Sequence, residues 1–163
     1  MKNDPTALRE LDGLLQEEIR CYGRLLVAMD RHLLALRNQD ALEIGEAMQA
    51  NLECVEAGRK VGLRRVTFTG RLLSVAGLRS DSGIEEILKT YADDVTRPLR
   101  EKLDGISRLG RDIRIINERN RALAEHGLDL LRGDFRILAD LVGETSDRPG
   151  ELGASGKLLS MRA

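Results

Sequence analysis

The last third of the chain carries an uninterrupted apolar pattern, which constrains the fold more than any other feature. Between residues 106 and 141 the spacing of the seam positions alternates between three and four without a slip. The seam consists of Ile106, Leu109, Ile113, Ile116, Asn120, Leu123, Gly127, Leu130, Asp134, Ile137 and Leu141. Such spacing keeps one stripe of a helix against a neighbour over many turns. We therefore predict a long helix from about Pro98 to Val142, on the order of 65 Å in length.

A similar pattern predicts a first helix over residues 5–37. Its apolar positions are Leu8, Leu15, Ile19, Tyr22, Leu26, Met29, Leu33 and Leu36. Residues 37–40 form a short turn in which Asn38 is expected to adopt the left-handed conformation that ends helices. Asp40 and Glu43 have the spacing of a capping box for the next helix. Because the connection is short, the first two helices should be antiparallel neighbours.

The second helix is expected to end near Ala76, and its apolar stripe is weaker. Val66-Thr67-Phe68-Thr69 has a local preference for β structure, which leaves open whether the helix is continuous there. Residues 77–83 should form a loop. Ser82-Gly83-Ile84-Glu85 has the pattern of another capping box, which would begin a short helix to about Tyr91. A second break is expected over residues 93–97.

Composition agrees with a helical fold. The chain has 163 residues, enough for one domain with a hydrophobic core. Only 2% of the residues are aromatic, so the core depends on Leu, Ile and Val, which favours packed helices over a β-sandwich or barrel. We predict an all-α fold in which long antiparallel helices form a helical bundle or coiled coil, with a short helix between the second and last long helices. The bundle domain should span residues 1–142, followed by a flexible tail over 143–163.

Several classes of function are disfavoured by what the chain contains. The net charge is −1, so the chain lacks the strongly basic field typical of nucleic-acid binding. Its two cysteines, Cys21 and Cys54, are isolated, and its two histidines, His32 and His126, stand apart, so we expect no metal site and no cofactor. Known catalytic motifs are missing, and we expect no enzymatic activity. Neither a signal peptide nor a membrane-spanning run is evident, and we expect a cytoplasmic protein.

The C-terminal half of the last helix carries a second apolar stripe beside the seam. It consists of Ala124, Leu128, Leu131, Phe135, Leu138 and Val142. The resulting apolar face is too wide for a single helical neighbour. Two interpretations remain open. The face is either core, covered by an element such as the short helix over 84–91, or a groove for the amphipathic helix of a partner.

A basic cluster in the second helix is the other candidate for binding. It consists of Arg59, Lys60, Arg64, Arg65 and Arg71. These residues could bind phosphate or an acidic partner, but no aromatic residues are interleaved for base stacking. The alternative is a solvated helix face with weak ion pairs, which is the usual behaviour of interleaved charges.

Three stretches of the chain together match a known pattern. They are a Leu-rich first helix with Glu17, Glu18, Tyr22, Leu25 and Leu26, then a turn and Asp40-Ala41-Leu42; a helix with Arg59 and a basic middle; and Ile115 to Leu123, with an Asn-x-x-Asn sequence at Asn117 and Asn120. Over residues 8–142 this arrangement resembles the FlgN-type flagellar export chaperones. The resemblance implies a type III export chaperone that binds the C-terminal helices of hook–filament junction proteins. It would keep these subunits unassembled and deliver them to the flagellar export apparatus.

The resemblance also implies that the last helix contacts the substrate. The predicted partner-binding residues are Asn117, Asn120, Leu123, Leu128, Leu131, Phe135, Leu138 and Val142. The apolar residues would cover the substrate helix, and Asn120 with Asn117 would fix its register within the bundle or against the substrate. Two alternatives are a structural or adaptor coiled coil, which could form a homo-oligomer, and a nucleic-acid-associated helical protein that uses the cluster over 59–71.

Overall fold

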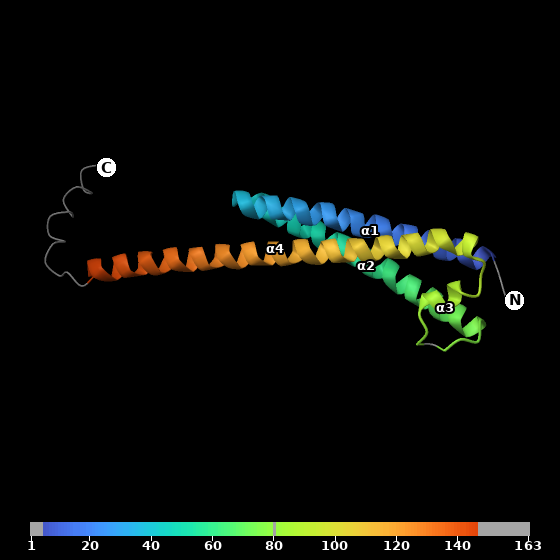
Figure 1. Cartoon of the computed structure of the whole chain (residues 1–163). Coiled ribbons are helices and arrows are strands. Elements are labelled where there is room, and N and C mark those ends of the chain that lie inside the picture. The colour runs from blue at the N-terminus through green and yellow to red at the C-terminus, as the bar shows by residue number, and fades with distance from the viewer. Residues whose placement is uncertain (1–4, 80, 147–163) are drawn as a thin grey trace, which may run out of the picture. The chain divides into compact units, whose positions relative to one another are not determined.

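The computed structural model describes residues 5–79 and 81–146, with side chains for residues 6–79 and 81–140. The described chain is helical and contains no strand. Its elements, shown in Figure 1, are α1 (Pro5–Asn38), α2 (Ala41–Val75), α3 (Ile84–Leu88) and α4 (Asp93–Ser146). This confirms the all-α fold and the short helix between the second and last long helices. The chain divides into two compact units, Met1–Leu123 and Ala124–Ala163. The predicted tail, apart from residues 143–146, lies outside the described residues.

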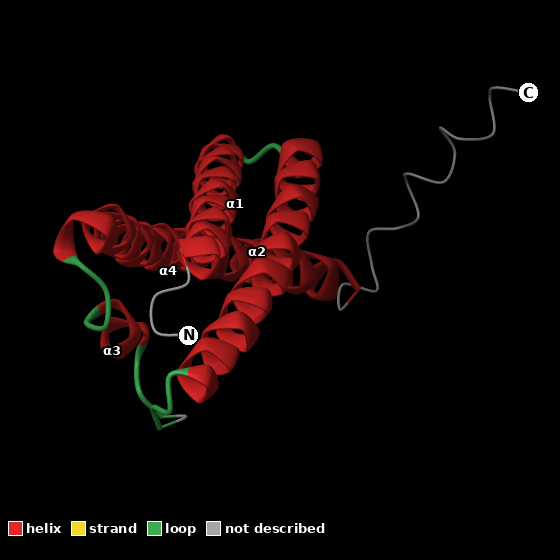
Figure 2. Ribbon diagram, turned by 90° about the vertical axis from the view of Figure 1, so that its right-hand side faces the viewer, coloured by secondary structure: helices red, strands yellow, loops and turns green. Residues whose placement is uncertain are grey.

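Helices α1 and α2 form an antiparallel hairpin, joined by the short connection at the top of Figure 2. The residue with a left-handed backbone is Gln39, with φ of 55°, so the prediction of Asn38 at this position was wrong. The Gln39 N–H donates to the Leu36 carbonyl and the Asp40 N–H to the Ala35 carbonyl. These two bonds satisfy the last carbonyls of α1 in a Schellman motif, which places the left-handed residue one position after Asn38.

Only half of the predicted capping box at the start of α2 is formed. The Asp40 Oδ1 accepts hydrogen bonds from the N–H groups of Leu42 (3.1 Å) and Glu43 (3.0 Å), as expected of an N-cap. The Glu43 carboxylate does not reach back to Asp40. It accepts from Arg31 Nη2 at 2.7 Å instead, because the antiparallel neighbour supplies a cation and the Asp40 N–H is already bonded to Ala35.

Helix α2 is continuous through Val66–Thr69, which settles the question left open by its local β preference. Phe68 packs against the hydrophobic core, so tertiary contacts outweigh the weak local propensity. The helix ends in a second Schellman motif, in which Gly77 has φ of 67° and the Leu78 N–H donates to the Leu73 carbonyl at 2.9 Å.

The junction of α3 and α4 differs from the prediction at three points. Helix α3 ends at Leu88 rather than near Tyr91, and its N-cap residue Gly83 makes no side-chain cap bond, so the capping box expected from Ser82 is not formed. The break predicted over residues 93–97 is helical, since α4 begins at Asp93 and includes Pro98. Pro98 is the sixth residue of α4, so its missing N–H leaves the Asp94 carbonyl, four positions earlier, without the usual helical donor.

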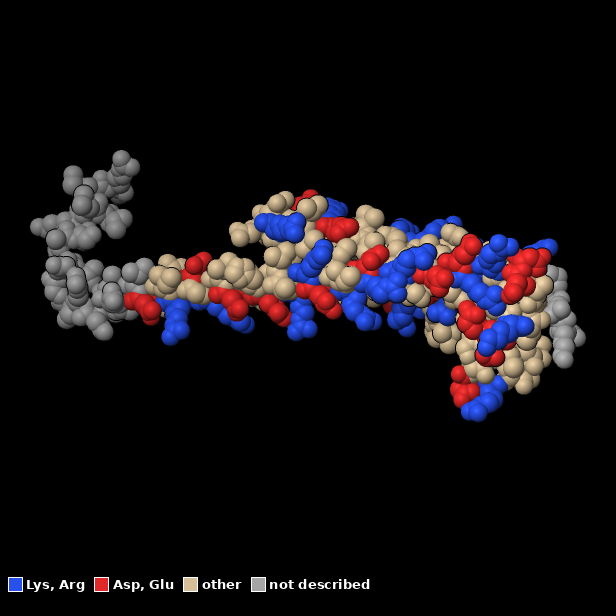
Figure 3. All heavy atoms as spheres, in the orientation of Figure 1, with Lys and Arg blue, Asp and Glu red and all other residues tan. Residues whose placement is uncertain are grey.

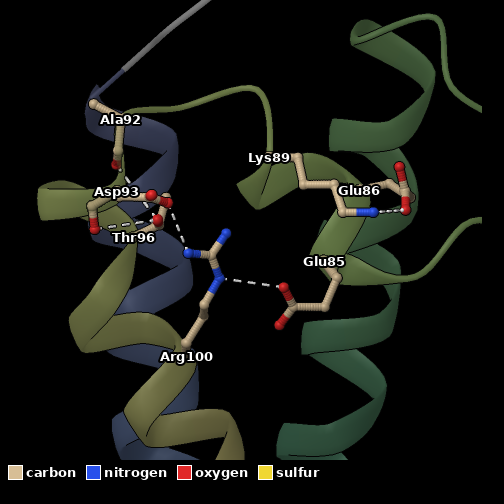
Figure 4. Close-up of polar contacts among 7 residues, drawn as sticks. All are labelled: Glu85, Glu86, Lys89, Ala92, Asp93, Thr96 and Arg100. Atoms are coloured by element: carbon tan, nitrogen blue, oxygen red, sulfur yellow. Dashed lines mark hydrogen bonds and ion pairs between the residues drawn. The ribbon is translucent and has the colours of Figure 1, made fainter.

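Polar contacts hold this start of α4 in place (Figure 4). The buried Thr96 hydroxyl donates to the Ala92 and Asp93 carbonyls at 3.3 and 3.4 Å. Arg100 Nη1 contacts the Asp93 carboxylate at 2.9 Å, and its Nε contacts Glu85 of α3 at 3.3 Å. Arg100 therefore links the short helix to the first turn of α4.

The hydrophobic core of the first unit lies where the N-terminal part of α1 meets α3 and the start of α4. Its buried members are Leu8, Leu11, Leu15, Leu88 and Leu99. Helix α4 runs parallel to α1, because Lys102 pairs with Asp12 at 2.6 Å and Asn120 contacts Met29 at 3.1 Å. Leu88 of α3 thus buries its side chain in this core, which gives α3 a packing role within the first unit.

Candidate partner-binding surface

Within the second unit, the described residues form a single helical segment of α4, over residues 124–146. Large apolar side chains on this segment expose between 50% and 70% of their surface. We call them the apolar face: Leu128, Leu130, Leu131, Phe135, Ile137 and Leu138. Contiguous exposed apolar side chains of this kind typically mark an interaction site, since monomeric proteins rarely leave large apolar patches uncovered.

The same segment carries most of its charges on the other side. In Figure 3, most acidic and basic atoms of this part of α4 gather along the lower edge at the left, while the upper edge is mainly uncharged and carries an acidic group among the uncharged atoms. The charged residues on that side recur three or four positions apart at Glu125, Asp129, Arg132 and Arg136. Arg132 Nη1 contacts Asp129 at 3.1 Å, a pair expected to contribute little stability because both side chains are exposed. The segment is therefore strongly amphipathic.

Asn120 occupies a seam position in the part of α4 that belongs to the first unit. Its side chain is 5% exposed, and its Nδ2 donates to the Met29 carbonyl of α1 at 3.1 Å. Its Oδ1 is buried and has no hydrogen-bond partner among the described residues. A buried amide that bonds one particular carbonyl restricts how two helices can slide, which agrees with the prediction that Asn120 fixes a register within the bundle. That role stays a prediction.

A second polar contact inside the helix packing joins α1 and α2. Glu18 is 1% exposed, and its carboxylate accepts hydrogen bonds from Arg65 Nε at 2.6 Å and from the Tyr22 hydroxyl at 3.2 Å. Burial and the neighbouring Glu18 charge raise the pKa of Tyr22. An open groove of about 320 Å³ runs beside this network. A Cβ atom at Gly58 would lie 3.3 Å from the Tyr22 ring, so the glycine permits close approach of the two helices here.

The predicted basic cluster is largely neutralised by carboxylates. Its ion pairs are Arg59 and Lys60 with Glu56, Arg64 with Glu17, and Arg65 with Glu18. The hydrogen bond from Arg59 lowers the pKa of Glu56, as expected for a carboxylate that stays charged beside a guanidinium. Four of the five cations in the cluster therefore have an acidic partner, and Glu56 serves two of them. The interpretation as a helix face with ion pairs agrees with this geometry.

The model for the family described as FlgN protein matches residues 1–146. The chain belongs to the FlgN family. FlgN-family proteins are flagellar export chaperones, so this chain takes part in flagellum biogenesis and type III protein export. Comparisons with curated proteins and with solved structures find no match.

In this FlgN-family chain, the predicted partner-binding residues fall into separate groups. Leu128, Leu131, Phe135 and Leu138 lie together on the apolar face of the second unit. The remaining described ones belong to the first unit, where Asn117 is exposed, Leu123 is half-buried and Asn120 is buried against α1. The side chain of Val142 lies outside the described residues. The binding role of all these residues stays a prediction.

Three exposed residues of the FlgN-family chain were not among the predicted site residues. Leu130, Asp134 and Ile137 follow the seam spacing, so the sequence pattern assigned them to packing against a neighbouring helix. In the second unit their side chains are exposed together with the second stripe. The signal that could have identified them is the width of the apolar face, because one neighbouring helix cannot cover both stripes.

Three other residues singled out in the sequence are His32, Cys21 and Cys54. His32 is half-buried, its Nδ1 lies 3.3 Å from Asn51 Nδ2, and burial lowers its pKa. Cys21 and Cys54 are free, partly buried thiols. Among the described residues, no group of three His, Cys, Asp or Glu side chains is placed to hold a metal ion. No described helix is both long and apolar enough to cross a membrane.

Proposed function

We propose that this FlgN-family protein is a cytoplasmic chaperone that binds the C-terminal helices of hook–filament junction proteins and delivers them to the flagellar export apparatus. The observation that supports this proposal most directly is the exposed apolar face of α4, which is suited to the apolar stripe of an amphipathic helix. Such a stripe pairs with sister subunits in an assembled filament. Uncovered in the cytoplasm, it would promote aggregation or early polymerisation.

The expected affinity is moderate. Full burial of a Leu or Phe side chain stabilises a complex by roughly 1.5–3 kcal/mol, but the side chains of the apolar face are already partly covered by their own helix. Ordering of the substrate helix and the loss of its free motion offset part of the gain. A complex of moderate affinity also suits a chaperone, because the substrate must be released for export.

An adaptor coiled coil that self-associates through the same face is the second candidate. The same exposed side chains favour it, since a second copy could cover them. The two functions differ in stoichiometry. A chaperone forms a 1:1 complex with the junction-protein helix, whereas an adaptor stays associated with itself and excludes the helix.

The test is binding of a synthetic peptide from the C-terminal helix of a junction protein to the full chain, measured by calorimetry and light scattering. We expect Phe135→Asp to weaken binding at least about tenfold, because a carboxylate would be placed within the buried contact. Ala122→Asp is the matched control. Ala122 is exposed and its surface neighbours on the helix, at positions 118, 119, 125 and 126, are all polar, so the same change in charge should leave binding intact.

Circular dichroism of both variants checks that the chain stays helical. Equal loss of binding in both variants, or none in either, would contradict the proposed site. Tight self-association of the wild-type chain that excludes the peptide would favour the adaptor.

A further inference from the structure

Asp134 occupies an unusual place on the apolar face. On a helix, the surface neighbours of a residue lie three and four positions away. For Asp134 these are Leu130, Leu131, Ile137 and Leu138, and all four are exposed aliphatic side chains. The carboxylate thus lies at the centre of four apolar side chains, on the side of the helix away from the charged residues. No other charged residue between positions 124 and 140 has such surroundings.

The Asp134 carboxylate also has no partner within the described part of the chain, where no hydrogen bond or ion pair involves it. Two buried polar residues in the helix contacts of the first unit, Glu18 and Asn120, differ in this respect. Glu18 accepts a hydrogen bond from Arg65, and Asn120 donates one to the Met29 carbonyl. Each of those side chains makes a specific contact with the helix that covers it, and the structure supplies no such contact for Asp134.

A helix that covers the apolar face must therefore also cover this carboxylate. If an apolar side chain is placed over Asp134, the carboxylate loses its hydration and forms no hydrogen bond or ion pair in return, which is strongly unfavourable. If an Arg or Lys is placed there, the charge is paired while the four surrounding side chains are buried. Arginine suits this position best, because its guanidinium can contact both carboxylate oxygens.

We propose that the apolar face selects a partner helix that carries an Arg or Lys within its own apolar stripe, and that this residue pairs with Asp134 and sets the register of the complex. The inference rests on the proposed function, because it specifies the substrate helix that the chaperone would bind. It adds a discriminating element to a surface that otherwise accepts any amphipathic helix of suitable length.

The charges on the face favour a different protein over a second copy of this chain. The apolar face contains no Lys or Arg, and the nearby basic residues Arg132 and Arg136 lie on the charged side. Two copies joined through the same face would leave both Asp134 carboxylates without a cation. An antiparallel pairing centred on Asp134 would also bring two like charges together.

The test uses the full-length chain and three synthetic amphipathic peptides of about 20 residues, long enough to form a helix when bound. The peptides share one leucine stripe and differ only at its central position, which is Arg, Leu or Glu. Binding is measured by fluorescence anisotropy. We expect the affinity of the Arg peptide to be at least about tenfold higher than that of the Leu peptide, although leucine is the more hydrophobic residue.

Variants of the chain identify the group responsible. Asp134→Asn should abolish the preference for the Arg peptide, and Asp134→Arg should shift it toward the Glu peptide. Asp140→Asn is the matched control, because it removes the same charge from the same helix outside the ring of aliphatic residues. It should leave the preference unchanged.

Three results would overturn the inference. Equal affinity of the wild-type chain for the Arg and Leu peptides would show that Asp134 does not select a cation. An equal effect of Asp134→Asn and Asp140→Asn would indicate attraction by overall charge only. Failure of all three peptides to bind would remove the docking surface as well. If the peptides bind without preference and Phe135→Asp still abolishes their binding, this inference fails while the proposed function stands.

Discussion

The Glu18–Arg65 pair offers a test in which the single and double substitutions should differ in size. Arg65→Met removes the cation but leaves a carboxylate that is 1% exposed, with the Tyr22 hydroxyl as its remaining contact. Breaking a buried pair in this way typically costs about 3–5 kcal/mol. Glu18→Met should cost less, about 1–2 kcal/mol, because the Arg65 side chain is 25% exposed and can turn toward water.

The double substitution Glu18→Met with Arg65→Met should be nearly neutral, within about 1 kcal/mol of the wild type, because no unpaired buried charge remains. The free energy of unfolding would be measured by urea denaturation, with an unchanged m-value as the sign that the transition stays comparable. Two results would refute the reasoning. One is a cost of Arg65→Met below about 0.5 kcal/mol, and the other is a double variant whose loss equals the sum of the two single losses.

Two further predictions concern single side chains in the first unit. Asn120→Leu removes a buried amide oxygen that has no hydrogen-bond partner, and it also removes the one hydrogen bond that the amide donates to Met29. The melting temperature should rise by about 2–4 °C, and calorimetry that finds a lower melting temperature would contradict this. Burial lowers the pKa of His32 in the folded state, so the unfolded chain binds the proton more readily. The free energy of unfolding should therefore rise with pH between the folded and unfolded pKa values of this group. His32→Gln should reduce that rise in urea midpoints between pH 5 and about 7, and an unchanged rise in the variant would contradict this.

The sequence pattern predicted the long helices because their apolar residues recur regularly over many turns. It misplaced helix ends, because single hydrogen bonds and ion pairs decide the residue at which a helix begins or ends. Pro98 suggested a helix start, yet α4 begins at Asp93, since the buried Thr96 and the Arg100 ion pairs hold the preceding turn. At Gln39, the Schellman hydrogen bonds rather than residue preference determine which residue adopts the left-handed conformation.

Contacts between distant parts of the sequence were beyond the reach of local patterns. Glu18 and Arg65 are 47 positions apart, and each belongs to a run of charges that resembles an ordinary solvated face. The apolar face was predicted from its second stripe, but its extent was not. A pattern of spacings identifies which side of a helix is apolar, and only the structure reports that Leu130 and Ile137 are exposed there.

Hydrogen exchange can show whether the apolar face of α4 holds a substrate helix. Amide exchange of the full chain would be compared with and without the C-terminal helix of a junction protein. Helical segments without packed neighbours open readily, so a covering helix should slow their exchange. We expect slower exchange concentrated in residues 124–140. Unchanged exchange there, with protection beside the α1–α2 groove instead, would contradict it.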